Sequence, residues 1–312
     1  IAMEDIEAGK LIYTYNVEGQ QIINAPDNKS RSGVLLYQFK DENNNPLNKF
    51  MVSAISSYYK DNQYFTFGHF ENGLFIVDKE VKTSFNDMYY TSSEPRQIIK
   101  TSDDVYHMLY TNTTYGDRNN YSYSINFTID DDYNISYLNQ TTVNGMEVGA
   151  YQEYPYFGYN NPLIQVGTDV FIGRTEWYGR GYYESQSANY VAFFTYDSSL
   201  KSFTIRGRTS AGVYQRYGKN FIFLNDDYVL TISNGNYQYN YYLQASVSNI
   251  NKEEYKFQDT FYSRYPSSGT TNYLLGSSMD TTRFKFIKKY DEVNNIYTVF
   301  MLHPTGSASY LA

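Results

Sequence analysis

The feature that most constrains the fold is an alternation of apolar and polar residues with a period of two, which recurs from one end of the chain to the other. Residues 121–127 (YSYSINF) and 283–287 (RFKFI) are examples. This period, in segments rich in Tyr, Phe, Thr, Ile and Val, is typical of half-buried β-strands. Apolar residues at helical spacing are nearly absent, so the sequence predicts an all-β fold.

The alternating segments recur in a unit made of a strand, an acidic or amide residue, a polar turn and a second strand. Six residues mark these units: Asp41, Asp78, Asp130, Asp197, Asn249 and Asp291. Successive markers are 37 to 67 residues apart, and the mean interval is 50. Four strands in about 50 residues match one blade of a β-propeller. A chain of 312 residues would then hold about six four-stranded blades.

A four-stranded blade has two apolar faces and cannot bury both alone, so blades stack until the ring closes. We therefore predict one β-propeller domain over residues 1–312, with a ring that could be incomplete at the termini. A pair of β-sandwiches, a β-solenoid and a mixed fold stay open as alternatives. Because the sequence starts at Ile1, we also expect a processed or trimmed chain.

Strands that end in Asp before a polar turn, as at Asp130 and Asp197, resemble those of propellers that lack a strict blade signature. These are the TolB-like propellers and the surface lipoprotein propellers that accompany outer-membrane importers in Gram-negative gut bacteria. The resemblance spans most of the chain and implies capture of a glycan or chelate beside an importer. The chain does not combine Gly-His with Trp-Asp as WD40 repeats do, and it lacks the kelch Gly-Gly doublet and the sialidase Asp-box, so no residue role is carried over.

Composition excludes several classes of function. The chain has no Cys, which excludes disulfides, thiolate metal sites and a cysteine nucleophile. Its 25 basic and 33 acidic side chains give a net charge of -8 without a basic stripe, so nucleic acid and anionic membrane surfaces are poor partners. Apolar runs such as residues 191–194 reach four residues, against about 18 for a spanning helix. No direct membrane insertion is expected.

Residues that could carry out chemistry are few and scattered. Of the three histidines, His107 alternates within a strand, and we expect it to be a packed or surface strand residue, whereas His69 and His303 fall near turns. Residues 130–134 (DDDYN) carry oxygen-bearing side chains at every second position, as a Ca²⁺-binding loop does. They lack the Gly and the distant Glu of an EF-hand loop, so we expect a hairpin turn.

No catalytic residue, metal site or cofactor is therefore predicted. Glu153, Glu176 and Glu184 would form a glycosidase pair only if the fold brought two of them within about 5–9.5 Å.

Tyrosine is concentrated in stretches rich in Gly, Asn and Ser, which indicate loops. The chain has 38 Tyr, and the densest stretches are residues 115–123, 151–161, 177–190 and 235–242. This mixture is typical of binding surfaces, because rigid aromatic rings give contact area at small entropic cost. Arginines flank the sole Trp, and Arg among aromatic faces suits planar rings, carboxylates or sugars. The candidate ligand-binding residues are Arg174, Trp177, Tyr178, Arg180, Tyr182, Tyr183, Tyr237, Tyr239 and Tyr241.

The alternative for these aromatic residues is packing between sheets. The sequence as a whole predicts a non-catalytic binding protein, extracellular or at a cell surface. Its expected partner is a glycan, a small ligand such as a metal chelate, or a surface or importer protein. A structural or receptor-binding protein of a phage or other virion is the first alternative, and a glycan-active enzyme is the second.

Overall fold

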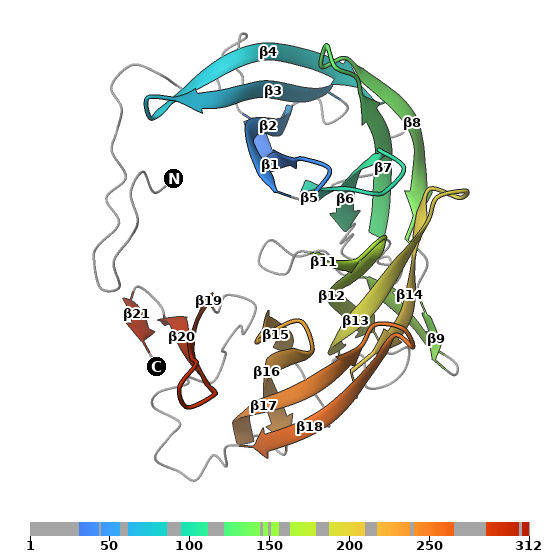
Figure 1. Cartoon of the computed structure of the whole chain (residues 1–312). Helices are drawn as coiled ribbons and strands as arrows, with labels where there is room; N and C mark the ends of the chain where they lie inside the picture. The colour runs from blue at the N-terminus through green and yellow to red at the C-terminus, as the bar shows by residue number, and fades with distance from the viewer. Residues whose placement is uncertain are drawn as a thin grey trace. The chain divides into compact units, whose positions relative to one another are not determined.

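The computed structural model describes residues 31–43, 45–56, 62–85, 95–111, 122–143, 146–148, 151–155, 163–178, 187–209, 217–237, 240–264, 285–305 and 308–311. These residues form strands and turns, and no helix occurs among them (Figure 1). The prediction of an all-β fold is confirmed. In the described part of the chain there is accordingly no helix of the length and apolarity needed to cross a membrane.

The strands form five antiparallel sheets in the described part of the chain, and each sheet is built from strands that are close in sequence. The first sheet contains β1 (Arg31–Lys40), β2 (Pro46–Ser56), β3 (Asn62–Glu71) and β4 (Leu74–Ser84). The second contains β5 (Pro95–Lys100), β6 (Tyr106–Thr111), β7 (Ser122–Ile129) and β8 (Ile135–Thr142). The third contains β9 (Met146–Val148), β10 (Tyr151–Pro155), β11 (Ile164–Gly167), β12 (Val170–Tyr178), β13 (Ser187–Asp197) and β14 (Ser202–Arg208). The fourth contains β15 (Tyr217–Phe223), β16 (Tyr228–Tyr237), β17 (Asn240–Asn251) and β18 (Lys256–Arg264). The fifth contains β19 (Lys285–Asp291), β20 (Ile296–Thr305) and β21 (Ala308–Leu311).

The third sheet departs from a simple four-stranded order. Strand β12 pairs with two strands along the same edge, with β11 near its start and with β10 near its end. The first strand of this sheet is thus interrupted between Pro155 and Ile164. Strand β9 then extends the sheet beyond β10. The interruption falls within the Tyr-rich stretch at residues 151–161.

The chain divides into two compact units. The first comprises Ile1–Glu94 and Thr128–Tyr137, and so holds the first sheet and the tip of the β7–β8 hairpin. The second comprises Pro95–Phe127 and Leu138–Ala312. The single domain over residues 1–312 stays a prediction.

Asp and Asn side chains close most of the short hairpins. Asp41 accepts hydrogen bonds from the backbone N–H of Asn43 (2.9 Å) and of Asn45 (2.8 Å). Asp130 accepts from the backbone N–H (2.7 Å) and the side-chain amide (2.8 Å) of Asn134. Four further residues bind backbone N–H groups two and three positions ahead: Asp197, Asn225, Asn251 and Asp291. These Asx turns use side-chain oxygens to replace missing backbone partners.

Three of these hairpins share a left-handed residue four positions after the Asp or Asn. The residues are Lys201 (φ 52°), Tyr255 (φ 55°) and Asn295 (φ 52°). Residues other than Gly seldom adopt this conformation, so the recurrence indicates one loop geometry used three times. Residues 130–134 also form a hairpin turn, as the sequence predicts, and Tyr133 is their left-handed residue (φ 59°).

Two of the six markers were wrong. Asp78 lies inside β4, where its carboxylate is 2.9 Å from His69 Nδ1, and the turn of this hairpin is Asn72-Gly73. Asn249 lies inside β17 opposite Tyr228, and Asn251 closes that turn instead. Both residues satisfy the pattern of an apolar strand followed by Asp or Asn, which does not distinguish a strand end from a polar position within a strand.

The spacing of the sheets also differs from the predicted repeat. The corresponding second strands of the five sheets are β2, β6, β12, β16 and β20. They begin at Pro46, Tyr106, Val170, Tyr228 and Ile296 respectively. These positions are 58 to 68 residues apart. The described part of the chain therefore contains five sheets and not the predicted six or so. The shorter mean interval arose because Asp41 and Asp78 both fall in the first sheet, so six markers were counted for five sheets.

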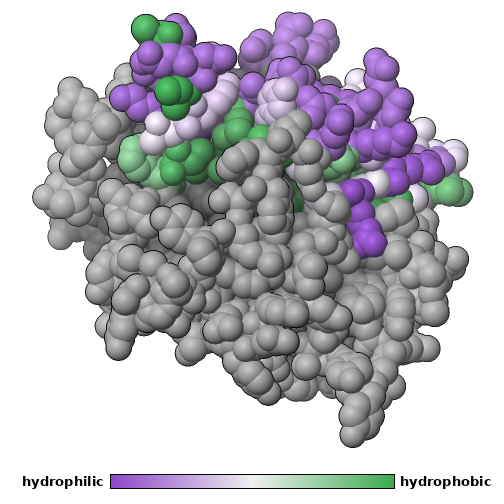
Figure 2. Space-filling model, turned by 90° about the horizontal axis from the view of Figure 1, so that it is seen from below, coloured by the Kyte–Doolittle hydropathy of each residue, from purple (hydrophilic) through white to green (hydrophobic). Residues whose placement is uncertain are grey.

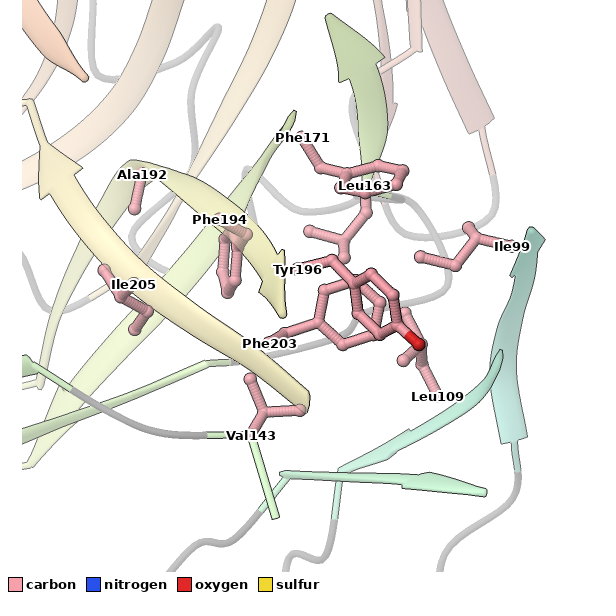
Figure 3. Packing of buried hydrophobic residues seen from close by; sticks show 10 residues of the cluster. All are labelled: Ile99, Leu109, Val143, Leu163, Phe171, Ala192, Phe194, Tyr196, Phe203 and Ile205. Atoms are coloured by element: carbon pink, nitrogen blue, oxygen red, sulfur yellow. The ribbon is translucent and has the colours of Figure 1, made fainter. Parts of the chain in front are cut away.

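Two apolar clusters hold the sheets of the second unit together. One joins the second and third sheets, and Figure 3 shows Tyr196 and Phe203 at its middle, between Ile99 and Leu109 on one side and Ile205 on the other. The other joins the third and fourth sheets through Ile172, Val191, Phe193, Phe221, Val229 and Ile250. Phe and Leu side chains of this size stabilise a fold by roughly 1.5–3 kcal/mol each when fully buried.

The tips of the second hairpins dock on the sheet that comes before them in the chain. In the first unit, Tyr133 stacks on Phe67 of β3, with ring centroids 4.5 Å apart. In the second unit, Tyr255 packs edge-on against Phe193 of β13, with centroids 5.9 Å apart. The Tyr255 backbone also approaches Gly207 on β14 closely.

Replacing Gly207 by alanine is expected to destabilise the protein by about 1–3 kcal/mol. A Cβ at this position would lie 2.0 Å from the carbonyl oxygen of Tyr255, which belongs to the backbone and cannot rotate away. At Gly167 the nearest atom would be the Val170 Cβ at 3.5 Å, so Gly167→Ala is the matched control with an expected change within about 0.5 kcal/mol. Urea unfolding measures both, and equal midpoints would contradict the close approach.

Candidate functional site

The best-formed polar cluster among the described side chains surrounds His107, between the second and third sheets. His107 Nε2 is 2.9 Å from the Thr101 hydroxyl, and Nδ1 is 2.8 Å from the Asn126 side-chain oxygen. All three side chains are buried. Asn126 uses its amide to donate to the side-chain oxygen of Asn139 (2.7 Å) and the carbonyl of Lys201 (2.9 Å). Its oxygen therefore faces His107 as an acceptor, which assigns a proton to Nδ1.

Asp103 connects this cluster to the third sheet. Its carboxylate forms an ion pair with Lys201 and accepts hydrogen bonds from the Thr101 hydroxyl (2.6 Å) and the Tyr196 phenol (3.1 Å). Burial acts to raise the pKa of Asp103, but these hydrogen bonds and the charge of Lys201 outweigh it and lower the pKa to about 2. Burial also raises the pKa of the Tyr196 phenol.

Burial lowers the pKa of His107 to about 4, although its hydrogen bond to the Asn126 oxygen and the charge of Asp103 act in the opposite direction. The imidazole is therefore neutral at pH 7. The rings of Tyr196 and Phe203 meet it edge-on, with centroids 4.7 Å and 4.9 Å away. The expectation of a packed strand residue at His107 is confirmed.

The order Thr101, His107, Asn126 formally follows a nucleophile, a base and an orienting group. Thr101 is 4% exposed, and its hydroxyl donates to Asp103 and lies 3.2 Å from the carbonyl oxygen of Val105. A substrate would have no access to it without opening the interface. We conclude that the cluster is a buried polar connection between two sheets.

No group of three or more His, Asp or Glu side chains with the arrangement of a metal site occurs among the described residues. The acidic residues of the hairpins are engaged in their own turns, as at Asp130. Figure 2 shows one side of the molecule, where the described residues are mainly hydrophilic with apolar ones between them. A binding surface on this protein would therefore combine aromatic and polar positions.

Each antiparallel sheet has two chemically different ends. The turns between first and second strands, and between third and fourth strands, lie at one end, which we call the hairpin end. The turn between second and third strands, with the entry and exit of the chain, lies at the opposite end, which we call the connection end. This follows from antiparallel strand order alone.

Within the second unit, polar contacts join the hairpin ends of neighbouring sheets. The backbone N–H of Ser102 donates to Asp169 in the third sheet (2.9 Å), beside the pairing of Asp103 with Lys201. In the fourth and fifth sheets, the Asn225 amide lies 3.3 Å from the Tyr297 hydroxyl. The hairpin ends thus gather on one side, and the connection ends lie on the other.

The Tyr-rich stretches all fall at connection ends. Residues 115–123, 177–190 and 235–242 span the links from second to third strands in the second, third and fourth sheets. Residues 151–161 span the interruption of the first strand of the third sheet. The Asx turns fall at the hairpin ends. In the second, third and fourth sheets, the tyrosine-rich stretches and the Asx turns thus take opposite ends of the sheet.

One face of the third sheet brings aromatic and charged positions together near its connection end. Trp177 of β12 is opposite Glu153 of β10 and Ala188 of β13. Tyr190 follows two residues after Ala188 on the same strand, and Arg208 of β14 is opposite Ala192, two residues further on. Register partners and alternate residues of a strand share a face. We call Glu153, Trp177, Tyr190 and Arg208 the diagonal patch; further along the same face, Phe171, Ala192 and Phe194 are buried in the cluster that joins the second and third sheets.

The other face of the third sheet carries Arg174, Glu176 and Tyr178, which alternate with Trp177 along β12. Arg174 is 4% exposed, so it packs between sheets. Arg174 and Tyr178 therefore do not share a face with Trp177. Glu153 and Glu176 also take positions on opposite faces, because Glu176 is opposite Tyr154. A glycosidase pair from these two glutamates would need both carboxyl groups in one cleft, where they would flank a glycosidic bond.

Of the remaining predicted site residues, Arg180, Tyr182, Tyr183 and Tyr239 lie outside the described residues, as does Glu184. Tyr237 and Tyr241 are at the connection end of the fourth sheet, opposite Asn240 and Asn236 respectively. These pairs are adjacent in register, so Tyr237 and Tyr241 take opposite faces. The sequence missed Arg208, which lies 31 residues from Trp177 and shares no motif with it.

Comparisons with known proteins identify no family. No family model matches the chain, and no curated protein matches it. Among solved structures, the chain is similar to an endo-arabinase from Bacteroides thetaiotaomicron. That similarity has a TM-score of 0.39 and 8% sequence identity, and covers 91% of this chain and 93% of the other. A likeness at this level supports no statement about activity or ligand.

Acidification is expected to destabilise the protein through His107. The pKa is about 4 in the folded state and about 6.5 in an unfolded chain, so the unfolded state takes up the proton first as pH falls. Stability is then lost between about pH 6.5 and pH 4, and the loss amounts to about 2 kcal/mol between pH 7 and pH 5.

The test is urea unfolding at pH 7 and pH 5. His107→Gln should lower stability at pH 7 but should remove this part of the pH dependence, whereas His69→Gln should retain it. The side chain of His69 is 36% exposed and paired with Asp78. The same pH dependence in His107→Gln as in the parent would contradict a buried neutral imidazole.

Proposed function

We propose that this protein is a non-catalytic binding protein whose sheets are the blades of a β-propeller and whose ligand contacts the connection ends of the third and fourth sheets. The five sheets of the described chain suggest five four-stranded units, with the interrupted first strand of the third sheet as a variation. In such a ring each blade covers the apolar faces of its neighbours.

The observation that carries the proposal is the separation of the two sheet ends. Short hairpins with Asx turns occupy one end, and tyrosine-rich segments with Gly, Asn and Ser occupy the other. If tyrosine only filled space between sheets, it would have no reason to favour the residues that link strands at one end. Rigid rings beside small polar residues are typical of surfaces that bind ligands.

The diagonal patch supports a glycan as the partner. An indole and a phenol offer flat apolar faces, and neighbouring Glu and Arg positions offer hydrogen bonds to hydroxyl groups. A metal chelate with aromatic or carboxylate groups is a second small ligand that would suit such a surface. Action at a cell surface or outside the cell, beside an importer, follows from the resemblance to surface lipoprotein propellers and is part of the proposal.

Trp177→Ala and Tyr190→Ala are expected to weaken ligand binding by about 1–3 kcal/mol each, as for aromatic anchors of other interfaces. Ligands are found first by thermal shift against a panel of oligosaccharides and ferric chelates. Titration calorimetry then compares the parent with both variants.

The matched control is Tyr290→Ala, which removes an exposed tyrosine at the hairpin end of the fifth sheet. This variant should bind as the parent does. A loss of thermal stability in Trp177→Ala without a loss of affinity would instead support packing between sheets. Catalytic turnover of a panel sugar would favour the glycan-active enzyme, and a stable symmetric assembly without any thermal shift would favour the virion protein.

A further inference from the structure

The turn between β3 and β4 differs chemically from the Asx turns of the other hairpins. It consists of Asn72 and Gly73, which lie between the paired residues Glu71 and Leu74. Both turn residues have left-handed backbones, with a φ of 49° at Asn72 and 78° at Gly73. These values are close to those of a type I′ turn, about +60° and +90°, for which Asn-Gly is a preferred sequence. Backbone conformation, and not an aspartate side chain, therefore sets the shape of this turn.

The side-chain amide of Asn72 is free to move. Asn72 is exposed and makes no hydrogen bond to any residue that the structure describes. In the Asx turns, by contrast, the aspartate that closes the turn also holds the amide of a nearby asparagine. Asn45 donates to Asp41 (2.9 Å) in this way, and Asn134 donates to Asp130 (2.8 Å). The amide of Asn72 can therefore approach the backbone beside it.

The position of the turn also keeps it accessible. The second hairpins of the next three sheets dock their tips on the sheet before them, through Tyr133, Lys201 and Tyr255. The first sheet has no earlier sheet within the described chain. The tip at Asn72 is accordingly exposed, whereas the corresponding tips are engaged in contacts.

The backbone can reach a reactive geometry without disturbing the strands. Rotation of the single peptide unit between Asn72 and Gly73 converts a type I′ turn into a type II′ turn, in which the first residue has a ψ of about -120°. Near this ψ, the Cγ atom of an asparagine lies beside the backbone nitrogen of the next residue. Gly73 accepts the accompanying change to a negative φ, and its lack of a side chain leaves room for the approach. Both turn types fit a two-residue hairpin, so the Glu71–Leu74 pair can stay intact.

From this arrangement we propose that Asn72-Gly73 is a site of spontaneous modification, at which Asn72 deamidates to aspartate and isoaspartate. The Gly73 backbone nitrogen loses its proton to base and attacks Asn72 Cγ, and the Cγ–Nδ2 bond breaks to release ammonia. Water then opens the resulting succinimide ring. Cleavage of the new Cγ–N bond gives aspartate, and cleavage of the backbone C–N bond gives isoaspartate. Each event adds one negative charge to the tip, and nothing in the proposal depends on the proposed binding function.

The same dipeptide at Asn234-Gly235 provides a control within the chain. It lies inside β16, where Asn234 is opposite Tyr217 in β15 and Leu243 in β17. Rotation of the peptide unit after Asn234 would break the pairing of a central strand, so the sheet would have to open locally first. In the folded protein, Asn234 should therefore deamidate at least about tenfold more slowly than Asn72.

The test incubates the folded protein in mildly alkaline buffer made with heavy-oxygen water, followed by peptide mapping with mass spectrometry. The peptide that contains Asn72 should lose ammonia and gain one heavy oxygen, at a rate that rises with hydroxide concentration. Enzymatic methylation of isoaspartate should label the same peptide. Asn72→Gly removes the amide and leaves Gly-Gly, which also suits a two-residue hairpin turn. This variant should show neither change at the turn.

The protein unfolded in urea supplies the reference, because both Asn-Gly sites should then react at similar rates. Equal rates at Asn72 and Asn234 in the folded protein would overturn the proposal, since the turn would then confer no reactivity. An unlabelled Asn72 peptide in the folded parent would overturn it as well. Equal release of ammonia by Asn72→Gly and the parent would place the reaction elsewhere in the chain, with the same consequence.

Discussion

The contact on which the second unit most depends is the docking of Lys201 on the second sheet. Its backbone carbonyl accepts hydrogen bonds from the Asn126 amide and the Thr141 hydroxyl, both at 2.9 Å, while its ammonium group pairs with Asp103. The left-handed backbone of Lys201 belongs to a turn that Asp197 closes, so an Asx turn inside one hairpin sets the geometry of a contact between two sheets. Because Asn126 is buried and Thr141 and Asp103 are half-buried, a shift of one sheet along the other would leave several polar groups without hydrogen bonds. The alignment of the hairpin ends, and with it the gathering of the connection ends on the other side, follows from this constraint.

The left-handed residue at the hairpin tip makes different contacts in other hairpins. Tyr133 and Tyr255 also have left-handed backbones at their hairpin tips, yet they dock through their rings, on Phe67 and Phe193 respectively. A short turn that must both close a hairpin and fit the sheet before it has little freedom in length or conformation. The links between second and third strands lie at the opposite end of each sheet from these turns. Large side chains can therefore accumulate there without disturbing the stacking of the sheets, which explains physically why the tyrosine-rich segments and the Asx turns are separated.

Much of the fold could be predicted because its signals are local. The alternation of apolar and polar residues over 121–127 indicates a strand, and Asp130 indicates the turn that follows it. Neither indication needs any knowledge of the rest of the chain. The number of sheets could not be predicted in this way, because both hairpins of a sheet use the same turn chemistry and a marker does not say which hairpin it closes. The diagonal patch depends on strand register, including a bulge at Phe193 and Phe194 that decides which residue of β14 is opposite Ala192. Trp177 was recognisable as the only tryptophan, whereas Arg208 became a candidate only once that register was known.

Net charge is also a poor guide to the ligand of a protein built in this way. The value of -8 suggests a surface that repels anions. Many of the acidic side chains, however, lie in hairpin turns, where carboxylates such as Asp41 and Asp130 serve as hydrogen-bond acceptors for nearby backbone groups. Those hydrogen bonds also lower the pKa of both residues, so they stay ionised at the hairpin end. At physiological ionic strength a charge acts over about 8 Å in solvent, which is much less than the length of these strands. A surface at the connection end is therefore governed by the charged residues close to it and not by the net charge of the chain.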